Sequence, residues 1–487
     1  MSWNPLYTRV SSDSHTILMA EIKFGTSGWR AIIAEDFTFE NARLATAGIV
    51  EYVKKSNPEP RVIVGYDTRF QADKFAWECT ELLSARGVRV CYCQSATPTP
   101  AIAYEIVKRK AAGGINFTAS HNPGEYCGLK FSSADGAPAL PEVTRAIERN
   151  IKELAKRPET FREWTPQSEL IERIDPGPEY LQMLAGKVDL PLIQRAGVKI
   201  SYDPLYGTGR GYFDKLLSDA GIVVSTIHDF RDVLFGGHPP EPAEEYLGDL
   251  KADLSRTGSK LGLSTDGDAD RFGILDEDGA FITPNQIIPL LFDYLVESRG
   301  WKEGAARSVA TSHFLDAVAK AHGRQLHETP VGFKYIGELI KADQIVIGGE
   351  ESSGLTIKGH VPEKDGILAC LLVAEMVARR GKSLRQQLND IEKRVGAFHT
   401  VRLNLRLTPE LKKKVKARLG NPPDRLGGKT VAKLNRADGL KLILEDGSWI
   451  LLRLSGTEPV ARCYVEAGSA AELARLTEVA RQFVLAA

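Results

Sequence analysis

The sequence has few cysteines, no net charge and no long apolar run. Its six cysteines are scattered over 487 residues, and Cys91-Tyr92-Cys93 lacks the two-residue spacer of a zinc or redox motif. We therefore expect reduced thiols in a cytoplasmic protein. The first twenty residues lack the basic start and apolar core of a signal peptide, and no apolar segment is long enough to cross a bilayer. Neither export nor membrane association is expected.

The charges balance, which argues against partners that select an overall charge of one sign. Lysine plus arginine number 63, and aspartate plus glutamate also number 63. A net charge of zero gives no general attraction to nucleic acid or to an anionic membrane, so any phosphate site must be built locally. The chain of 487 residues is also too long for one ordinary core, and several domains are expected.

Predicted strands and helices alternate through most of the chain. Short apolar runs at 61–67 and 88–93 predict buried parallel strands, and the segments 39–55 and 72–85 predict helices. A strand followed by a glycine-containing polar loop occurs three times before residue 395, which suggests an internal repeat. We therefore predict an α/β protein with three similar α/β sandwich domains whose mixed sheets are rich in parallel strands.

The last part of the chain has a different pattern. A strand is predicted at 400–407, a helix at 409–419, and a hairpin around Glu445-Asp446-Gly447. This predicts a smaller C-terminal α+β domain, tethered near Val395-Gly396, and a central cleft between the four domains. The expected domain bounds are 1–170, 171–282, 283–395 and 396–487.

A run of small and polar residues, Asn116-Phe117-Thr118-Ala119-Ser120-His121-Asn122-Pro123-Gly124, follows a predicted strand. Pro123-Gly124 favours a turn, so Ser120 is expected on a tight loop with its hydroxyl exposed. His121 and Lys130 are candidates to polarise that hydroxyl or to place positive charge beside it. From these residues alone, a polar turn without chemistry is the simpler interpretation.

Three carboxylates alternate with small residues in Asp266-Gly267-Asp268-Ala269-Asp270-Arg271. In an extended loop this spacing turns Asp266, Asp268 and Asp270 to one side, and hard oxygen ligands of this kind suit Mg²⁺. An EF-hand loop is a partial alternative, because Glu277 falls at the twelfth position, but Arg271 stands where that loop requires glycine. A solvated acidic turn is the other alternative.

Two more loops have the residue types of a sugar-phosphate site. Gly349-Glu350-Glu351-Ser352-Ser353-Gly354 follows a predicted buried strand and offers a carboxylate that can accept hydrogen bonds from adjacent hydroxyls. Arg453-Leu454-Ser455-Gly456-Thr457-Glu458-Pro459 combines a guanidinium, two hydroxyls and a glycine, which together form an anion cradle. Taken alone, the first is more often a strand end and the second a surface hairpin.

Together, these four motifs resemble in type and order those of the α-D-phosphohexomutases, over about residues 24–466. That family contains phosphoglucomutases, phosphomannomutases and phosphoglucosamine mutases. The resemblance implies a Mg²⁺-dependent enzyme that interconverts hexose 1- and 6-phosphates through a phosphoserine and a 1,6-bisphosphate. It further implies one Mg²⁺ per chain and glucose 1,6-bisphosphate as activator or intermediate.

The resemblance also assigns expected roles to individual residues. Ser120 carries the phosphoryl group and completes the metal site formed by the three aspartates. Catalytic support is expected from His121, Lys130, Arg30, Arg271 and, as general acid or base, Lys364. Sugar and phosphate binding are expected from Lys334, Glu350, Ser352, Arg453, Ser455, Gly456, Thr457 and Arg462.

The sugar and the competing functions remain open at this point. Some bacterial phosphomannomutases end the sugar loop with histidine, whereas this chain has Gly354, which favours glucose over mannose. A phosphomannomutase, a phosphoglucosamine mutase and a non-catalytic sugar-phosphate sensor are the alternatives. A serine hydrolase is disfavoured because no Gly-x-Ser-x-Gly elbow exists. Tyr206-Gly207-Thr208-Gly209-Arg210-Gly211 has the wrong glycine spacing for a dinucleotide site. The sequence leaves open whether the protein is a monomer or a homodimer.

Overall fold

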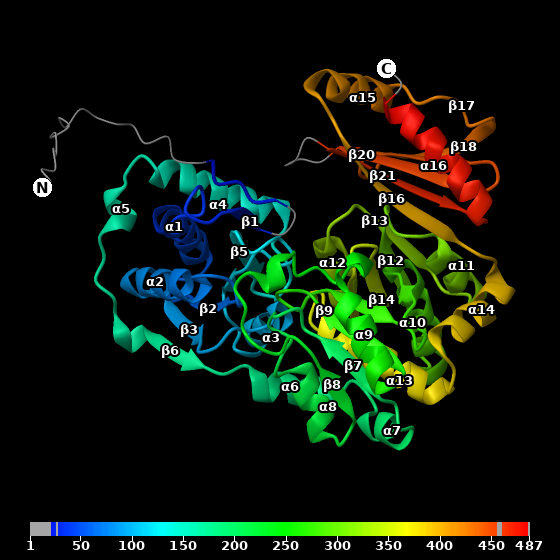
Figure 1. The fold of residues 1–487 in the computed structure, drawn as a ribbon. Coiled ribbons are helices and arrows are strands. Elements are labelled where there is room, and N and C mark those ends of the chain that lie inside the picture. Colours follow the sequence, from blue (N-terminus) through cyan, green and yellow to red (C-terminus); the bar gives the residue numbers. More distant parts are fainter. Residues whose placement is uncertain (1–20, 26–27, 455–459, 486–487) are drawn as a thin grey trace, which may run out of the picture.

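The computed structural model describes residues 21–25, 28–454 and 460–485, which form four sheets (Figure 1). The first sheet has the strand order β1-β5-β4-β2-β3-β6, with parallel pairing from β4 to β6 and antiparallel pairing of β4, β5 and β1. Its strands are β1 (Trp29–Ile32), β2 (Arg61–Tyr66), β3 (Arg89–Cys93), β4 (Gly113–Phe117), β5 (Tyr126–Ser133) and β6 (Ile171–Ile174). Its helices are α1 (Phe39–Ser56), α2 (Ala72–Ala85), α3 (Thr99–Lys108), α4 (Pro141–Leu154) and α5 (Glu159–Arg162).

The second sheet has the order β11-β10-β9-β7-β8, parallel from β9 to β8 and antiparallel from β9 to β11. Its strands are β7 (Ile200–Asp203), β8 (Val224–Thr226), β9 (Leu261–Thr265), β10 (Phe272–Leu275) and β11 (Phe281–Ile282). The helices of this part are α6 (Gly177–Ala185), α7 (Leu190–Arg195), α8 (Phe213–Asp219) and α9 (Gly248–Thr257).

The third sheet has the order β13-β12-β14-β15, and only β15 is antiparallel to its neighbour. Its strands are β12 (Gly304–Ser308), β13 (Leu326–Thr329), β14 (Ile345–Glu350) and β15 (Gly354–Ile357). The helices are α10 (Pro284–Arg299), α11 (Phe314–Ala321), α12 (Phe333–Lys341), α13 (Gly366–Arg380) and α14 (Leu384–Val395).

The three sheets share one arrangement, which confirms the predicted fold class. In each, a parallel core ends in an antiparallel pair: β4 with β5, β9 with β10, and β14 with β15. The segments that connect these pairs, 118–125, 266–271 and 351–353, contain three of the four polar motifs of the sequence. The repeat therefore places one functional loop at the equivalent point of each sheet.

The fourth sheet is wholly antiparallel and has its own core, as predicted for the C-terminal α+β domain. Its strands are β16 (His399–Arg406), β17 (Arg425–Leu426), β18 (Lys429–Asn435), β19 (Leu440–Leu444), β20 (Trp449–Leu454) and β21 (Val460–Ala467). Its helices are α15 (Pro409–Gly420) and α16 (Ala470–Leu485). Thr408 caps α15 by accepting a hydrogen bond from the backbone N–H of Leu411.

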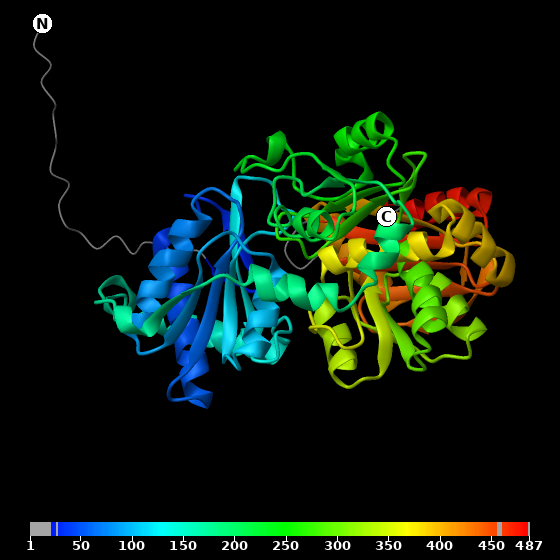
Figure 2. The same ribbon diagram turned by 90° about the horizontal axis from the view of Figure 1, so that it is seen from below.

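The four parts are joined to different degrees. Helix α13 packs against β9 and β10 of the second sheet and also against α10 and β15 of the third, so one apolar cluster serves both. The first sheet and its helices form a separate lobe beside the others (Figure 2). The third and fourth parts meet at a smaller apolar cluster, where the buried Lys441 Nζ donates to the Val309 carbonyl at 2.9 Å. We propose four domains with the expected bounds. Strand β6, which begins just beyond residue 170, pairs with β3 and so belongs to the first sheet.

Among the helices of the described segments, none has the length and apolar character needed to cross a membrane.

Candidate active site

Ser120 lies where the first sheet meets the second. Its loop begins directly after the fully buried strand β4, and its backbone takes the left-handed conformation with φ of 54°. The Ser120 hydroxyl donates to Asp266 Oδ2 at 2.7 Å, and its backbone N–H donates to Thr118 Oγ1 at 2.9 Å. Ser120 is only 1% exposed. The expectation of an exposed hydroxyl is therefore wrong, because the aspartate loop of another sheet covers it.

The three aspartates lie between β9 and β10, and all are buried. One carboxylate oxygen from each lies within 4.8 Å of the others. Within the part of the chain that the structure describes, Asp268 Oδ1 and Asp270 Oδ1 are buried without a hydrogen-bond partner. A buried carboxylate oxygen without a donor is costly unless a cation fills the place, so this donor set fits Mg²⁺. The flanking elements are strands, which excludes the helix–loop–helix of an EF-hand.

Two buried lysines reach the same carboxylates. Lys130 Nζ, on β5, lies 2.5 Å from Asp268 Oδ2 and 3.0 Å from Asp270 Oδ2. Lys364 Nζ lies 2.9 Å from Asp270 Oδ2 and 3.0 Å from Glu363 Oε1. Although burial acts in the opposite direction, Lys130 and Lys364 hold the pKa of Asp270 well below its usual range. Burial and the neighbouring Asp268 instead raise the pKa of Asp266.

Arg30 and His121 complete this side of the site. Arg30, on β1, donates from Nη1 to Asn122 Oδ1 at 2.6 Å, and burial together with Arg271 lowers its pKa to about 10. His121 Nδ1 lies 3.4 Å from Ser120 Oγ. Burial, followed by the charges of Arg271 and Arg30, lowers the pKa of His121 well below its usual value, so its imidazole is neutral at pH 7. The backbone N–H of Arg271 donates to Asp266 Oδ1 at 3.0 Å.

The third sheet contributes a buried carboxylate at the end of β14. Glu350 accepts a hydrogen bond from the Gly332 N–H at 2.8 Å, and burial together with Glu351 raises the pKa of Glu350 to about 7. Ser352 lies in the turn that follows and is partly exposed. Lys334 is the second residue of α12, and its charge interacts with Glu142 of the first domain and with Glu350.

The fourth sheet presents two arginines side by side. Arg453 on β20 and Arg462 on β21 are direct cross-strand partners, so their side chains share one face of the sheet. Arg453 Nη2 lies 2.7 Å from Asp438 Oδ2, and the same oxygen accepts the Val331 N–H at 3.1 Å. Ser455, Gly456 and Thr457, expected in the anion cradle, lie outside the described residues.

Two residues that link parts of this site are not predicted by the sequence. Thr99, at the start of α3, donates from its hydroxyl to Asp268 Oδ2 and thereby ties the first domain to the metal loop. Asp438 joins Arg453 to the loop that precedes α12. The long-range partners of Thr99 and Asp438 are set by tertiary folding, so no local pattern identifies them.

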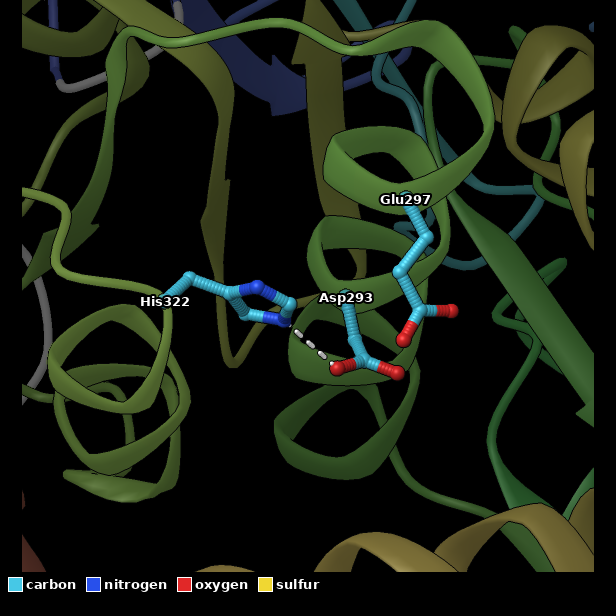
Figure 3. Close-up of side chains that lie close together, drawn as sticks. All are labelled: Asp293, Glu297 and His322. Carbon is cyan, nitrogen blue, oxygen red and sulfur yellow. Dashed lines mark hydrogen bonds and ion pairs between the residues drawn. The ribbon is translucent and has the colours of Figure 1, made fainter.

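A second group of metal-ligating residue types, Asp293, Glu297 and His322, lies on α10 and just after α11 (Figure 3). His322 Nε2 lies 2.7 Å from Asp293 Oδ1. Arg394 also bonds to that oxygen, and Arg380 bonds to Asp293 Oδ2 and to Glu297. The guanidinium groups already neutralise these carboxylates, so we interpret the group as an ion-pair network that holds α10, α13 and α14 together.

Comparison with known proteins agrees with this geometry. Four domain models described as phosphoglucomutase/phosphomannomutase, alpha/beta/alpha domains I, II and III and C-terminal domain, match residues 21–158, 178–279, 283–395 and 403–482. A phosphoglucomutase/phosphomannomutase of Thermococcus kodakarensis is 30% identical, with 92% of this chain and 94% of the relative covered. A probable phosphoglucosamine mutase of Methanopyrus kandleri is also 30% identical, with the same coverage.

Solved structures give the same assignment. The crystal structure of a putative phosphomannomutase from Thermus thermophilus aligns with a TM-score of 0.84 and 33% identity, covering 96% of this chain and all of that one. The chain belongs to the phosphoglucomutase/phosphomannomutase family, the α-D-phosphohexomutases, and is an intramolecular phosphotransferase.

Proposed function

We propose that this phosphohexomutase interconverts glucose 1-phosphate and glucose 6-phosphate, with Ser120 as the phosphoryl carrier and glucose 1,6-bisphosphate as the intermediate. The observation that carries the proposal is the 2.7 Å hydrogen bond from Ser120 Oγ to Asp266 Oδ2. This hydrogen bond joins Ser120, the only serine of segment 116–124, to the aspartate cluster of the second sheet. The proposed phosphoryl carrier and the proposed metal ligands therefore lie next to each other.

The residues around Ser120 suit phosphoryl transfer in both directions. PhosphoSer120 gives its phosphoryl group to the free sugar hydroxyl: the P–Oγ bond breaks, a new P–O bond to the sugar forms, and the proton lost by that hydroxyl is balanced by the proton that Ser120 Oγ gains. The bisphosphate then reverses its orientation within the site, and its other phosphoryl group is transferred to Ser120. The neutral His121 imidazole lies with Nδ1 3.4 Å from Ser120 Oγ, where it can form a hydrogen bond to that oxygen without adding charge. Lys130, Arg30 and Arg271 supply positive charge around the transferring group.

The metal site is assigned to Asp266, Asp268 and Asp270, with a phosphoryl oxygen on Ser120 completing it. The unpartnered oxygens of Asp268 and Asp270 support this assignment. Bound Mg²⁺ would supply positive charge beside the moving phosphoryl group. Thr99 and Lys130 hold Asp268 in place from the first domain.

Sugar binding is assigned to the third and fourth domains. Glu350 and Ser352 are proposed to bind adjacent sugar hydroxyls, with Lys334 beside them, while Arg453, Ser455, Gly456, Thr457 and Arg462 are proposed to bind the phosphate that is not being transferred. Lys364 is proposed to act as general acid or base. Asp270 and Glu363 outweigh the effect of burial and raise its pKa, which favours the protonated, acidic form.

The preference for glucose is supported by Gly354. A Cβ at this position would overlap the Lys364 side chain, so the histidine found here in some phosphomannomutases is incompatible with the observed place of Lys364. Mannose and glucosamine phosphates are the alternative substrates, and the names of the relatives include both. A sugar-phosphate sensor is less well supported, because a sensor needs neither a carrier serine nor a metal site.

A coupled assay that compares the 1-phosphates of glucose, mannose and glucosamine tests the proposal. We expect the highest kcat/KM for glucose 1-phosphate, with dependence on Mg²⁺ and stimulation by glucose 1,6-bisphosphate. A higher kcat/KM for either other sugar would replace the proposed substrate, and absence of turnover with all three would favour the sensor.

A further inference from the structure

Arg69 lies completely buried behind the Ser120 loop and faces the backbone of that loop rather than its side chains. A guanidinium has five N–H donors in a fixed planar fork. Three of these donors go to loop carbonyls and one to the first residue of β5: Nη2 donates to the Ser120 and Asn122 carbonyls, each at 2.6 Å, and Nη1 to the Pro123 and Tyr126 carbonyls at 2.7 and 3.0 Å. The fifth, on Nε, bonds to Asp67 Oδ2 at 3.0 Å. Every donor of Arg69 is used, and most of them fix the shape of one turn.

The same group closes a ring of hydrogen bonds around Ser120. The Ser120 N–H donates to Thr118 Oγ1, and Thr118 Oγ1 in turn donates to Asp67 Oδ2 at 2.6 Å. Asp67 forms an ion pair with Arg69, and Arg69 Nη2 donates a hydrogen bond to the Ser120 carbonyl. Both backbone polar groups of Ser120 are therefore tied to the Asp67–Arg69 pair, which holds a non-glycine residue in the left-handed conformation that it otherwise rarely adopts.

We propose that Arg69 is a positioning residue for phosphoryl transfer, because it fixes the Ser120 loop through its carbonyl groups. A trans peptide directs its C=O and N–H to opposite sides. The Ser120 carbonyl faces Arg69, so the following N–H, that of His121, is directed away from Arg69. The carbonyl oxygens of the loop, which carry partial negative charge, therefore point towards Arg69 and away from a phosphoryl group on the Ser120 hydroxyl.

The second domain covers this arrangement from outside. The Phe235 ring centroid lies 4.9 Å from the Arg69 guanidinium carbon, and Arg231 donates to the Thr68 and Arg69 carbonyls, each at 3.0 Å. A Cβ on Gly124 would lie 2.8 Å from the Val233 carbonyl oxygen, so the end of the loop is also closely packed. Arg69 is thus shielded from water, which makes its hydrogen bonds stronger and the loss of one more costly.

The inference rests on the proposed carrier role of Ser120, and the test separates the two. Arg69→Lys keeps a buried cation, but an ammonium has three donors at one point and cannot reach four carbonyls and Asp67 together. We expect kcat to fall on the order of 10²-fold while KM for glucose 1-phosphate changes little, because the reacting atoms are displaced and the sugar contacts are not. Arg299→Lys is the matched control: its guanidinium bonds to the Lys187 carbonyl and to Glu375, and its kcat should match the wild type.

Three further measurements distinguish positioning from a purely structural role. Thermal unfolding should show Arg69→Lys to be folded at the assay temperature. Transfer of ³²P from the labelled phosphoenzyme to glucose 1-phosphate should slow in the variant by the same factor as kcat. Added guanidinium ion, well below denaturing concentrations, should restore activity to Arg69→Ala more than added ammonium ion does.

The outcomes are distinct. Wild-type protein that takes up no label on Ser120 would overturn the carrier role itself. A labelled wild type together with an Arg69→Lys variant of unchanged kcat would overturn the positioning role alone. Failure of both Arg69→Lys and Arg69→Ala to fold, or a loss of activity confined to KM, would assign Arg69 to fold stability or substrate binding and would also overturn it.

Discussion

Ser120 makes contacts with two sheets, and this determines what its replacement should do. Ser120→Ala removes the hydroxyl that donates to Asp266 and contacts His121 Nδ1, so the cost in stability should be on the order of 1 kcal/mol. Turnover should be abolished. Intact-mass measurement of the wild type should show a gain of one phosphate after incubation with glucose 1,6-bisphosphate, and the variant should show none.

The control for this substitution is Ser84→Ala on α2, where a buried serine bonds to the Glu81 carbonyl far from the motif loops. It should retain wild-type turnover. Activity in Ser120→Ala equal to that of the control would rule out a phosphoserine mechanism.

The two clusters of metal-ligating residue types allow a matched test of the metal site. Asp268→Asn keeps the shape of the side chain but removes charge from a cluster with unpartnered oxygens, so the affinity for Mg²⁺ should fall roughly tenfold or more. Asp293→Asn changes an aspartate whose partners are arginines and a histidine, so Mg²⁺ affinity should be unchanged. Calorimetric titration of Mg²⁺ measures both, and equal affinities would argue against the assigned site.

We expect Glu350 to make substrate binding dependent on pH. Its folded-state pKa of about 7 lies above the ordinary value of 4.5, so its ionisation costs stability as the pH rises from about 4.5 through about 7, by up to about 3 kcal/mol. The carboxylate formed over this range is the better acceptor for sugar hydroxyls. KM for glucose 1-phosphate should therefore fall as the pH rises through about 7.

Glu350→Gln is the control, because the sugar phosphate itself titrates near pH 6. In the variant, KM should change with pH only as far as the titration of the sugar phosphate requires. At pH 8 the variant should also unfold at a higher temperature than the wild type. Identical pH profiles for the two proteins would mean that this carboxyl does not contact the sugar.

At the scale of single residues, the sequence predicted which types of residue form the site but not how they are buried. Asp266, Asp268 and Asp270 were found because their spacing is local. The burial of Ser120 was missed because the loop that covers it is more than 140 residues further along the chain. Lys364 was expected in the site only through the family resemblance, and it is buried against Asp270 through a contact that no local pattern contains.

Among the elements, the antiparallel pair β14–β15 and the segment before α13 act as one unit. The Lys364 side chain packs over Gly354, so Gly354→Ala should push Lys364 away from Asp270 and lower kcat roughly tenfold or more. Gly248→Ala at the start of α9 is the control, because a Cβ there meets none of the described residues within 4 Å. A kcat in Gly354→Ala equal to that of Gly248→Ala would mean that Lys364 has no part in the reaction.

Element boundaries were predicted well where the pattern is local. The predicted helix at 72–85 matches α2, and the run at 61–67 matches β2 to within one residue. The pairing of elements was not predictable in the same way. Helix α13 follows β15 in sequence, yet it also packs on β9 and β10, because its apolar residues surround the helix and need cover on more than one side.

At the scale of the whole molecule, the connection between the third and fourth domains determines whether the site can open and close. Gly396 ends α14 with φ of 90°, and the fourth sheet has a core of its own, so this domain can turn as a unit. We expect it to close when Arg453 binds the distal phosphate. Arg453→Ala should raise KM at least tenfold and also lower kcat, if binding drives closure.

Solution scattering measures the closure directly. The radius of gyration should fall when glucose 1,6-bisphosphate saturates the wild type, and it should not fall in Arg453→Ala at the same concentration. Identical curves for the free and saturated wild type would mean that the joint near Gly396 is only a linker.

Helix α13 is translated after the whole of the second sheet, although it covers one face of that sheet. At about 5–20 residues per second, the intervening chain takes on the order of ten seconds to leave the ribosome. During that interval we expect the apolar residues of β9 and β10 to be open to chaperones and proteases, while the first sheet is already complete with its helices. The nascent chain should therefore fold in three stages rather than four. The apolar residues of the second and third sheets should become inaccessible to chaperones and proteases at the same stage.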